Sequence, residues 1–240
     1  MFSKIALAKM IDHSLLRPDA KLDDVVRVCE EAKEYHFACV MVLPYWCSAA
    51  ERRLRDSDVK VGTVIAYPCG AATTSVKAYE ARQAIANGAA ELDMVANLGA
   101  LKSRDYETVQ RDIEEVVTAA KMAGLTDDGD DIQTKVIVEV GLTTRDEQAR
   151  LCRMAKAARA DFVKTCTGQG PRSVTVQDVK HLRHEAGREM GIKAAGGIRT
   201  IQQAMALINA GANRLGTSTG VGIVEAYDQS QGTLVEEVLR

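Results

Sequence analysis

Residues 134–168 read TKVIVEVGLTTRDEQARLCRMAKAARADFVKTCTG, and they hold the pattern that decides the fold. Two short runs rich in β-branched residues, TKVIVEV (134–140) and DFVKTCT (161–167), flank the stretch TRDEQARLCRMAKAARA (144–160). The short runs predict strands, and the spacing of apolar residues three and four apart between them predicts an amphipathic helix. This part of the chain therefore predicts a strand–helix–strand unit.

The same alternation extends over the whole chain. Further strand-like runs are DHSLL (12–16), ACVMVLP (38–44), KVGTVIAYP (60–68), ELDMVAN (91–97), GIKAAGG (191–197) and NRLGTST (213–219). Helical spacing recurs between them, for example in residues 21–36, 75–89, 103–124 and 201–212. Eight such units fit a (β/α)8 barrel better than a doubly wound sheet, which usually has fewer strands. No linker or low-complexity segment divides the chain, so we expect one TIM barrel domain over residues 1–240.

The composition excludes several classes of protein. With 31 basic and 33 acidic residues, the chain has no electrostatic reason to bind nucleic acid or an anionic membrane. The opening MFSKIALAKMIDHS is too short an apolar run for a signal peptide, and no window approaches the roughly 20 apolar residues of a membrane span. Six cysteines without a CxxC pair indicate buried thiols. We therefore expect a cytoplasmic protein.

Two predicted strands carry a lysine near the carboxyl end. Alternation along FVKTCT (162–167) puts Lys164 on one face with Phe162 and Cys166, and Lys193 lies in GIKAAGG on the next strand. Neighbouring strands are about 4.8 Å apart, and barrels build their sites at this end, so we expect both ammonium groups in one pocket. Burial and a like charge both lower a lysine pKa. One of the two amines is then a nucleophile for carbonyl carbon, which is Schiff-base chemistry.

A carboxylate must exchange protons beside such an amine. Asp93 lies at the end of the fourth strand and is the candidate for this general acid/base work. The structural alternative is that Lys164 only neutralises Asp93 or Glu139, since an isolated buried charge is costly, and that Asp93 is only a counter-ion for the lysines. Position alone leaves both roles open for Asp93.

Glycine-rich loops after the last three strands predict a phosphate site. Barrels often bind phosphate there, through loop N–H groups and a helix N-terminus. Glycine allows close backbone approach, and hydroxyl groups add donors. The predicted phosphate-binding residues are Gly168, Gly196, Gly197, Ser218 and Thr219, with Gly170 in the first of these loops.

Two alternatives remain from the residues alone. In a metal-dependent enzyme, His181 and His184, spaced i, i+3 in a predicted helix, would be the candidate ligands, although a surface position is the simpler interpretation. A non-catalytic barrel that binds sugar phosphates is the other alternative. Such a protein has little use for two lysines and a carboxylate in one pocket.

Six segments, in order, resemble the deoxyribose-phosphate aldolases. They are IDHSLLRP (11–18), VKAYEARQAIANGAAELDMVANLGALK (76–102), KVIVEVGLTTRDE (135–147), FVKTCTG (162–168), IKAAGGIRT (192–200) and RLGTSTG (214–220). The resemblance implies a (β/α)8 class I aldolase of nucleotide catabolism that needs no metal or organic cofactor. The implied reaction is reversible cleavage of 2-deoxy-D-ribose 5-phosphate to acetaldehyde and D-glyceraldehyde 3-phosphate.

The resemblance also implies roles for individual residues. Lys164 would be the Schiff-base lysine, Lys193 the lysine that perturbs it, and Asp93 the proton-relay carboxylate. Asp12 matches a polar residue near the second lysine. The implied partners are a small-molecule sugar phosphate and further copies of the chain, as a homodimer or a higher homo-oligomer.

Three places depart from the family pattern. The second strand reads VMVLP (40–44), with Met41 and Leu43 where a cysteine and an asparagine are common, and AYPCG (66–70) differs from the usual phenylalanine-proline version. The C-terminal VEEVLR (235–240) lacks the terminal tyrosine of some members. Because a lost amide donor changes how a hydroxyl group is held, an aldolase that acts on another phosphorylated or nonphosphorylated aldehyde stays open.

Overall fold

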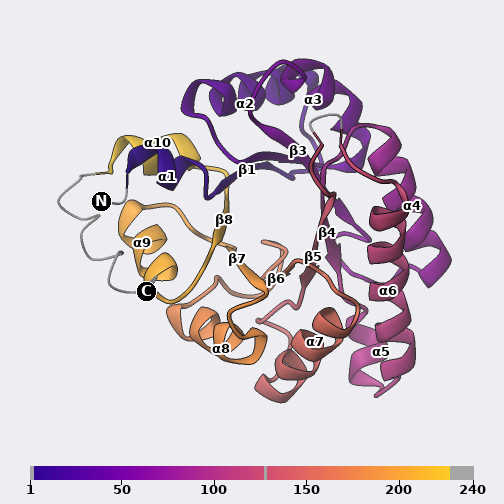
Figure 1. Ribbon diagram of the computed structural model, residues 1–240. Helices are drawn as coiled ribbons and strands as arrows, with labels where there is room; N and C mark the ends of the chain where they lie inside the picture. The colour runs from indigo at the N-terminus through magenta and orange to yellow at the C-terminus, as the bar shows by residue number, and fades with distance from the viewer. Residues whose placement is uncertain (1–2, 127–128, 228–240) are drawn as a thin grey trace.

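The structure is a computed structural model that describes residues 3–126 and 129–227. Eight parallel strands close into a barrel in sequence order, and helices surround it (Figure 1). The strands are β1 (Ile11–Leu15), β2 (Cys39–Val42), β3 (Lys60–Ile65), β4 (Glu91–Val95), β5 (Gln133–Ile137), β6 (Phe162–Lys164), β7 (Gly191–Ala195) and β8 (Arg214–Thr217). The predicted (β/α)8 fold is confirmed.

The outer layer consists mainly of the helices that alternate with the strands. They are α1 (Lys4–Ala8), α2 (Leu22–Tyr35), α3 (Cys47–Leu54) after the 3-10 turn η1 (Pro44–Trp46), α4 (Thr74–Ala86), α5 (Leu98–Lys102), α6 (Tyr106–Met122), α7 (Arg145–Ala157), α8 (Val176–Ala186), α9 (Ile201–Asn209) and α10 (Gly220–Glu225). Within residues 3–126 and 129–227, none of them is long and apolar enough to cross a membrane. The predicted helices all form, whereas the short α1, η1 and α5 were not predicted.

The strands are buried on both faces, as parallel barrel strands are. Outward side chains such as Val40, Leu92 and Ile192 are fully buried in the core between the barrel and the helices. Inward side chains include the charged residues described below. At Gly62 of β3, an added Cβ would lie 2.3 Å from Met41 Sδ, so a glycine leaves room for a large neighbour.

Capping interactions set where the helices after the site loops begin. A threonine side chain accepts from the N3 backbone N–H, and the N3 side chain accepts from the N-cap N–H, at the start of α7, α8 and α9. The pairs are Thr144 with Glu147, Thr175 with Asp178, and Thr200 with Gln203. These three helix starts bound the loops that follow β5, β6 and β7.

All eight strands end one to three residues before the runs that predicted them, and two of these ends leave a polar residue outside its strand. Because β4 ends at Val95 and β5 ends at Ile137, Asn97 and Glu139 lie two residues beyond their strands. Asn97 is the N-cap of α5, with its side chain accepting from Ala100 N. Glu139 is buried and has a φ of 48°, a value that ends the extended backbone there.

Candidate active site

Lys164 and Lys193 lie side by side inside the barrel. Lys164 ends β6 and pairs in register with Lys193 of β7, and both are almost fully buried. Their Nζ atoms donate to the same oxygen, Asp93 Oδ2, at 2.8 and 2.6 Å. Lys193 also forms an ion pair with Asp12. The structure thus brings together the four residues that the sequence singled out as catalytic candidates.

Three further charged residues extend this cluster into an ion network. Lys135 Nζ lies 2.5 Å from Glu91 Oε2 and 3.2 Å from Asp93 Oδ1. Arg214 Nη1 lies 2.7 Å from Asp12 Oδ1 and 3.0 Å from Glu91 Oε1. Sequence reasoning missed Lys135, Glu91 and Arg214. Glu91 could have been found from the sequence, because it lies two residues before Asp93 in one strand, and the alternation of a strand puts both side chains on the same face.

The charges of this network do not balance. Four cationic side chains face three carboxylates: Lys135, Lys164, Lys193 and Arg214 against Asp12, Glu91 and Asp93. If every group were ionised, the buried network would carry one excess positive charge. Because an uncompensated buried charge is costly, one of the lysines is driven toward its neutral form.

Lys164 is the lysine that best accommodates proton loss. Burial lowers its pKa, and the Lys193 ammonium lowers it further, against the opposing effect of Asp93. Burial also disfavours the charge on Lys193, but the carboxylates of Asp12 and Asp93 outweigh it and raise the Lys193 pKa. The pKa of Lys135 is raised as well, because Asp93 and Glu91 outweigh its burial.

Asp93 is held as a carboxylate. Burial alone would raise its pKa, but Lys135, Lys164 and Lys193 bring it well below the usual value. Before substrate arrives, Asp93 is therefore an ionised carboxylate that is shared by three lysines and accepts hydrogen bonds from Lys164 and Lys193.

A pocket of about 420 Å³ opens at the carboxyl ends of the strands and reaches this cluster. Lys164 is among its lining residues, whereas Lys193, Asp93 and Asp12 are not. The rest of the wall comes mostly from the segments that follow β1, β6, β7 and β8. A small molecule in this pocket can thus touch Lys164 but not the other three residues.

Most of the predicted phosphate residues line the same pocket. They are Gly168, Gly196, Gly197 and Ser218. Thr219 is not among the lining residues, and its hydroxyl lies 3.0 Å from that of Thr217 and 3.3 Å from the carbonyl of Ile198. Thr219 therefore stabilises the loop after β8 through these contacts and does not face the pocket.

Three arginines that sequence reasoning missed also line the pocket. Arg27 is paired with Glu31 at 2.8 Å, and Arg17 with Asp19 at 2.8 Å. Arg199 is exposed, and within residues 3–126 and 129–227 its guanidinium has no ion pair. The available signal was its position two residues after the glycine pair in AAGGIRT. Arg199 is the cation most available to an anionic ligand.

One side of the barrel interior is apolar. The buried Cys39, Met41 and Val64 form a small cluster, against which Leu16, Ala38, Leu43 and Tyr67 pack. Met41, one of the departures from the family pattern, is fully buried, while Leu43 is half-buried beside it. Tyr67 and Leu16 line the pocket. The two departures therefore lie in the apolar layer next to the pocket wall.

The histidines that the sequence offered as metal ligands do not form a metal site in the described residues. His181 lies on α8, where its Nε2 is 3.2 Å from the carbonyl oxygen of Arg145. Among residues 3–126 and 129–227, Asp12, Cys39 and Glu91 are the one group of three potential ligands close enough together. Lys193, Lys135 and Arg214 already neutralise those two carboxylates, so a cation there would face three positive side chains. This donor set does not fit a resident metal ion.

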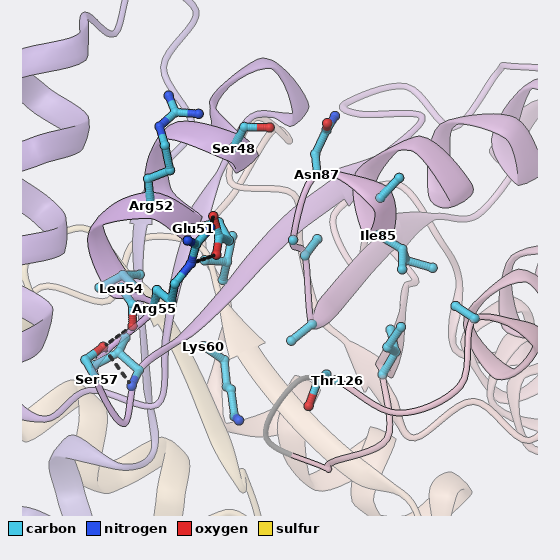
Figure 2. Close-up of a pocket in the computed structure, with 18 of the residues that line it drawn as sticks. Ser48, Glu51, Arg52, Leu54, Arg55, Ser57, Lys60, Ile85, Asn87 and Thr126 are labelled. Atoms are coloured by element: carbon cyan, nitrogen blue, oxygen red, sulfur yellow. Dashed lines mark hydrogen bonds and ion pairs between the residues drawn. The ribbon is translucent and has the colours of Figure 1, made fainter.

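A second pocket, of about 560 Å³, lies at the opposite, amino-terminal ends of β3 and β4 (Figure 2). Glu51 and Arg55, which form an ion pair at 2.8 Å, lie on one of its walls, and Asn87 and Thr126 lie across from them. None of the predicted site residues lines it. This end of a barrel mainly serves stability.

The segment VEEVLR (235–240), which differs from the family pattern in lacking a terminal tyrosine, lies outside the described residues.

Comparisons with known proteins agree with this geometry. A model of the DeoC/LacD family aldolases matches residues 6–226. A deoxyribose-phosphate aldolase of Thermococcus gammatolerans is 51% identical over 221 residues, which is 91% of this chain and 95% of that protein. One from Thermoanaerobacter is 49% identical over 223 residues, 93% of this chain and 97% of that protein. The solved tetrameric deoxyribose phosphate aldolase of Aeropyrum pernix matches with a TM-score of 0.84 and 34% identity, over 96% of this chain and 94% of that one.

Proposed function

Because the chain belongs to the DeoC/LacD family of aldolases, we propose that it reversibly cleaves 2-deoxy-D-ribose 5-phosphate through a Schiff base on Lys164. The products are acetaldehyde and D-glyceraldehyde 3-phosphate. The observation that carries this proposal is the charge imbalance of the buried network, together with the fact that Lys164 alone of its three lysines lines the pocket. Its relatives' names supply the substrate.

The chemistry follows from a neutral amine at this position. Lys164 Nζ attacks the aldehyde carbon C1 of the open-chain sugar, and loss of water gives an iminium. The C3 hydroxyl then loses its proton and the C2–C3 bond breaks, so that D-glyceraldehyde 3-phosphate leaves. The bonding electrons move into the iminium and leave an enamine on Lys164. Protonation of the enamine carbon and hydrolysis release acetaldehyde and restore the amine.

The residues behind Lys164 have distinct roles in this proposal. Lys193 stays an ammonium, because Asp12 and Asp93 raise its pKa, and its charge keeps Lys164 easier to deprotonate. Asp93 accepts hydrogen bonds from both amines. As a carboxylate, Asp93 accepts the proton of the C3 hydroxyl through a water while Lys164 carries the iminium, and it returns that proton to the enamine carbon. Asp12 forms ion pairs with both Lys193 and Arg214 and so holds Lys193 in place.

The phosphate end of the substrate fits the other side of the pocket. Backbone N–H groups at Gly168, Gly196 and Gly197, with the Ser218 hydroxyl, are the proposed donors, and Thr219 supports them. Arg199 adds a positive charge at the rim. In this proposal, the reacting carbon of the substrate lies at Lys164 and its phosphate lies at the loops.

We also propose that the chain works as a homo-oligomer in the cytoplasm. A relative of known structure is described as a tetramer. All six cysteines are free thiols, and all but Cys69 are buried, which suits a reducing compartment. Size-exclusion chromatography with light scattering tests the assembly, and a mass equal to the 26.0 kDa of one chain would contradict it.

Borohydride trapping tests the central step. Incubation with acetaldehyde and borohydride should add one ethyl group to the intact protein, and peptide mapping should place it on Lys164. Lys77 is an internal control, because it too is a fully buried lysine with a lowered pKa, caused mainly by burial, but it pairs with Asp112 between α4 and α6. Lys164→Ala should give neither adduct nor turnover.

Other results would favour other functions. An unmodified protein that still binds the sugar phosphate would indicate a binding protein without catalysis. Equal cleavage rates for 2-deoxyribose and its 5-phosphate would remove the phosphate site and favour an aldolase for uncharged aldehydes. Activity that a chelator abolishes and zinc restores would indicate a metal-dependent reaction.

A further inference from the structure

Glu139 has both an unfavourable backbone conformation and an unpaired buried carboxylate oxygen, and the proposed mechanism does not use it. It is a non-glycine residue with a φ of 48°, and it is 2% exposed. One carboxylate oxygen, Oε1, is buried without a hydrogen-bond partner. Among the ion pairs of residues 3–126 and 129–227, none includes Glu139. Strained backbone and unpaired buried polar atoms persist where the surrounding structure gains something from them.

The other oxygen of Glu139 holds the loop after β6. Oε2 accepts from the Thr167 backbone N–H at 2.9 Å and from the Thr167 hydroxyl at 2.5 Å. The same hydroxyl accepts from the Gln169 N–H at 3.0 Å. Glu139 therefore orders Thr167 directly and Gln169 through it, with Gly168 between them.

The loop is also tied from the other side of the pocket. Tyr67 donates its hydroxyl to the Thr167 carbonyl at 3.0 Å, so both backbone groups of Thr167 are fixed by side chains from different loops. Gly170 packs directly on the carboxylate, because an added Cβ there would lie 2.5 Å from Glu139 Oε1. Gly168 itself has open space around the position of a Cβ. Hydrogen bonds thus hold Thr167 from both sides, whereas the space beside Gly168 is open to a ligand.

The backbone around Glu139 is fixed in turn. Its carbonyl accepts from the Leu142 N–H at 2.9 Å and from the Thr143 hydroxyl at 3.0 Å. The neighbouring Val140 N–H donates to the Thr165 carbonyl at 2.9 Å, one residue past Lys164. These bonds hold Glu139 in its left-handed conformation and orient its carboxylate toward Thr167.

We propose that Glu139 is a positioning residue for the substrate's phosphate. It keeps Thr167, Gly168 and Gln169, all of which line the pocket, in the conformation that receives the phosphate. It acts through Thr167 and has no part in the chemistry at Lys164. The proposal rests on the proposed function, since it assumes that the phosphate lies against this loop.

The test compares a phosphorylated and an unphosphorylated substrate. In Glu139→Ala, the KM for 2-deoxyribose 5-phosphate should rise about tenfold or more, because the two hydrogen bonds that order Thr167 are lost. The kcat/KM for 2-deoxyribose and the rate of borohydride trapping with acetaldehyde should stay near the wild-type values. Thr167→Val should behave like Glu139→Ala. Glu139→Gln, whose amide oxygen can still accept both bonds, should lie closer to the wild type.

A matched control separates positioning from stability. Asp112→Asn alters another buried carboxylate, which pairs with Lys77 away from the pocket, and it should leave the ratio of the two substrates unchanged. If Glu139→Ala and Thr167→Val lower activity toward both substrates and trapping in the same proportion, the proposal is overturned. An unchanged KM for the phosphorylated substrate in either variant would overturn it as well.

The outcomes also separate this inference from the proposed function. If Glu139→Ala does not fold, judged by circular dichroism, Thr167→Val and Glu139→Gln decide the matter. If the wild type traps acetaldehyde on Lys164 but cleaves both substrates equally well, the positioning role fails while the Schiff-base aldolase stands. If the wild type forms no adduct, the proposed function itself fails, and this inference with it.

Discussion

Replacing Lys193 with methionine should move the reactivity of Lys164 to higher pH. The Nζ atoms of both lysines bond to Asp93 Oδ2 at 2.8 and 2.6 Å, so they lie no farther apart than the sum of these distances, 5.4 Å. At an effective dielectric constant of about 20, two unit charges at that separation repel each other by about 3 kcal/mol. Losing this repulsion favours the protonated form of Lys164 by about a hundredfold.

The variant should still fold, because the carboxylates keep cationic partners. Asp93 retains Lys135 and Lys164, and Asp12 retains Arg214 at 2.7 Å. Methionine has a similar length and no charge, so it fills most of the vacated space. The loss is therefore mainly electrostatic.

The assay is borohydride trapping with acetaldehyde over a series of pH values, followed by intact-protein mass spectrometry. The trapping rate is proportional to the neutral fraction of Lys164, so in the neutral range it should fall about a hundredfold and recover at high pH. Lys102→Met is a matched control, since Lys102 pairs with Glu147 at the surface. A curve with an unchanged midpoint and a uniformly lower rate would refute the tuning role of Lys193.

Three further predictions concern the same site. Asp93→Asn should lower the free energy of unfolding by about 3–5 kcal/mol, because it leaves buried ammonium groups without their shared counter-ion, and an unchanged urea midpoint would contradict this. Since the folded-state pKa of Asp93 is lowered, its contribution to stability is complete above the unfolded value of about 3.9 and is lost as the pH falls further. The stability difference between wild type and Asp93→Asn should therefore shrink in acid, and a constant difference would speak against the ionised carboxylate. Arg199→Ala should raise the KM for 2-deoxyribose 5-phosphate about tenfold, through loss of one charge-assisted contact, with trapping of acetaldehyde unaffected; equal losses in both assays would show that Arg199 acts elsewhere.

Much of the architecture could be predicted because its signals are local. Residues 134–168 contain the strand–helix–strand pattern, and repeating it eight times leads to the closed barrel. Thr144 with Glu147 marks the start of α7 in the same way, since a capping box lies within four residues. The places where strands end were less accurate. Glu139 was expected within the fifth strand, but its φ of 48° follows from contacts with the next loop.

The residues of the candidate site likewise fall into those that local sequence signals predict and those that they do not. Lys164 and Lys193 could be expected in one pocket from alternation and strand order alone, and Asp93 from its place at a strand end. The sequence also determined the family-like order of motifs. It did not single out Lys135 or Arg214, because each is an ordinary charged residue within its own segment.

Only the tertiary structure decided which lysine can be neutral. That choice depends on Asp12 and Asp93 raising the pKa of Lys193 while burial and Lys193 lower that of Lys164. These groups come from strands as far apart in sequence as β1 and β7, and closing the barrel brings them within ion-pair distance. The physical reason is that a strand pattern depends on neighbouring residues, whereas a pKa depends on distance and burial, which exist only once the chain has folded.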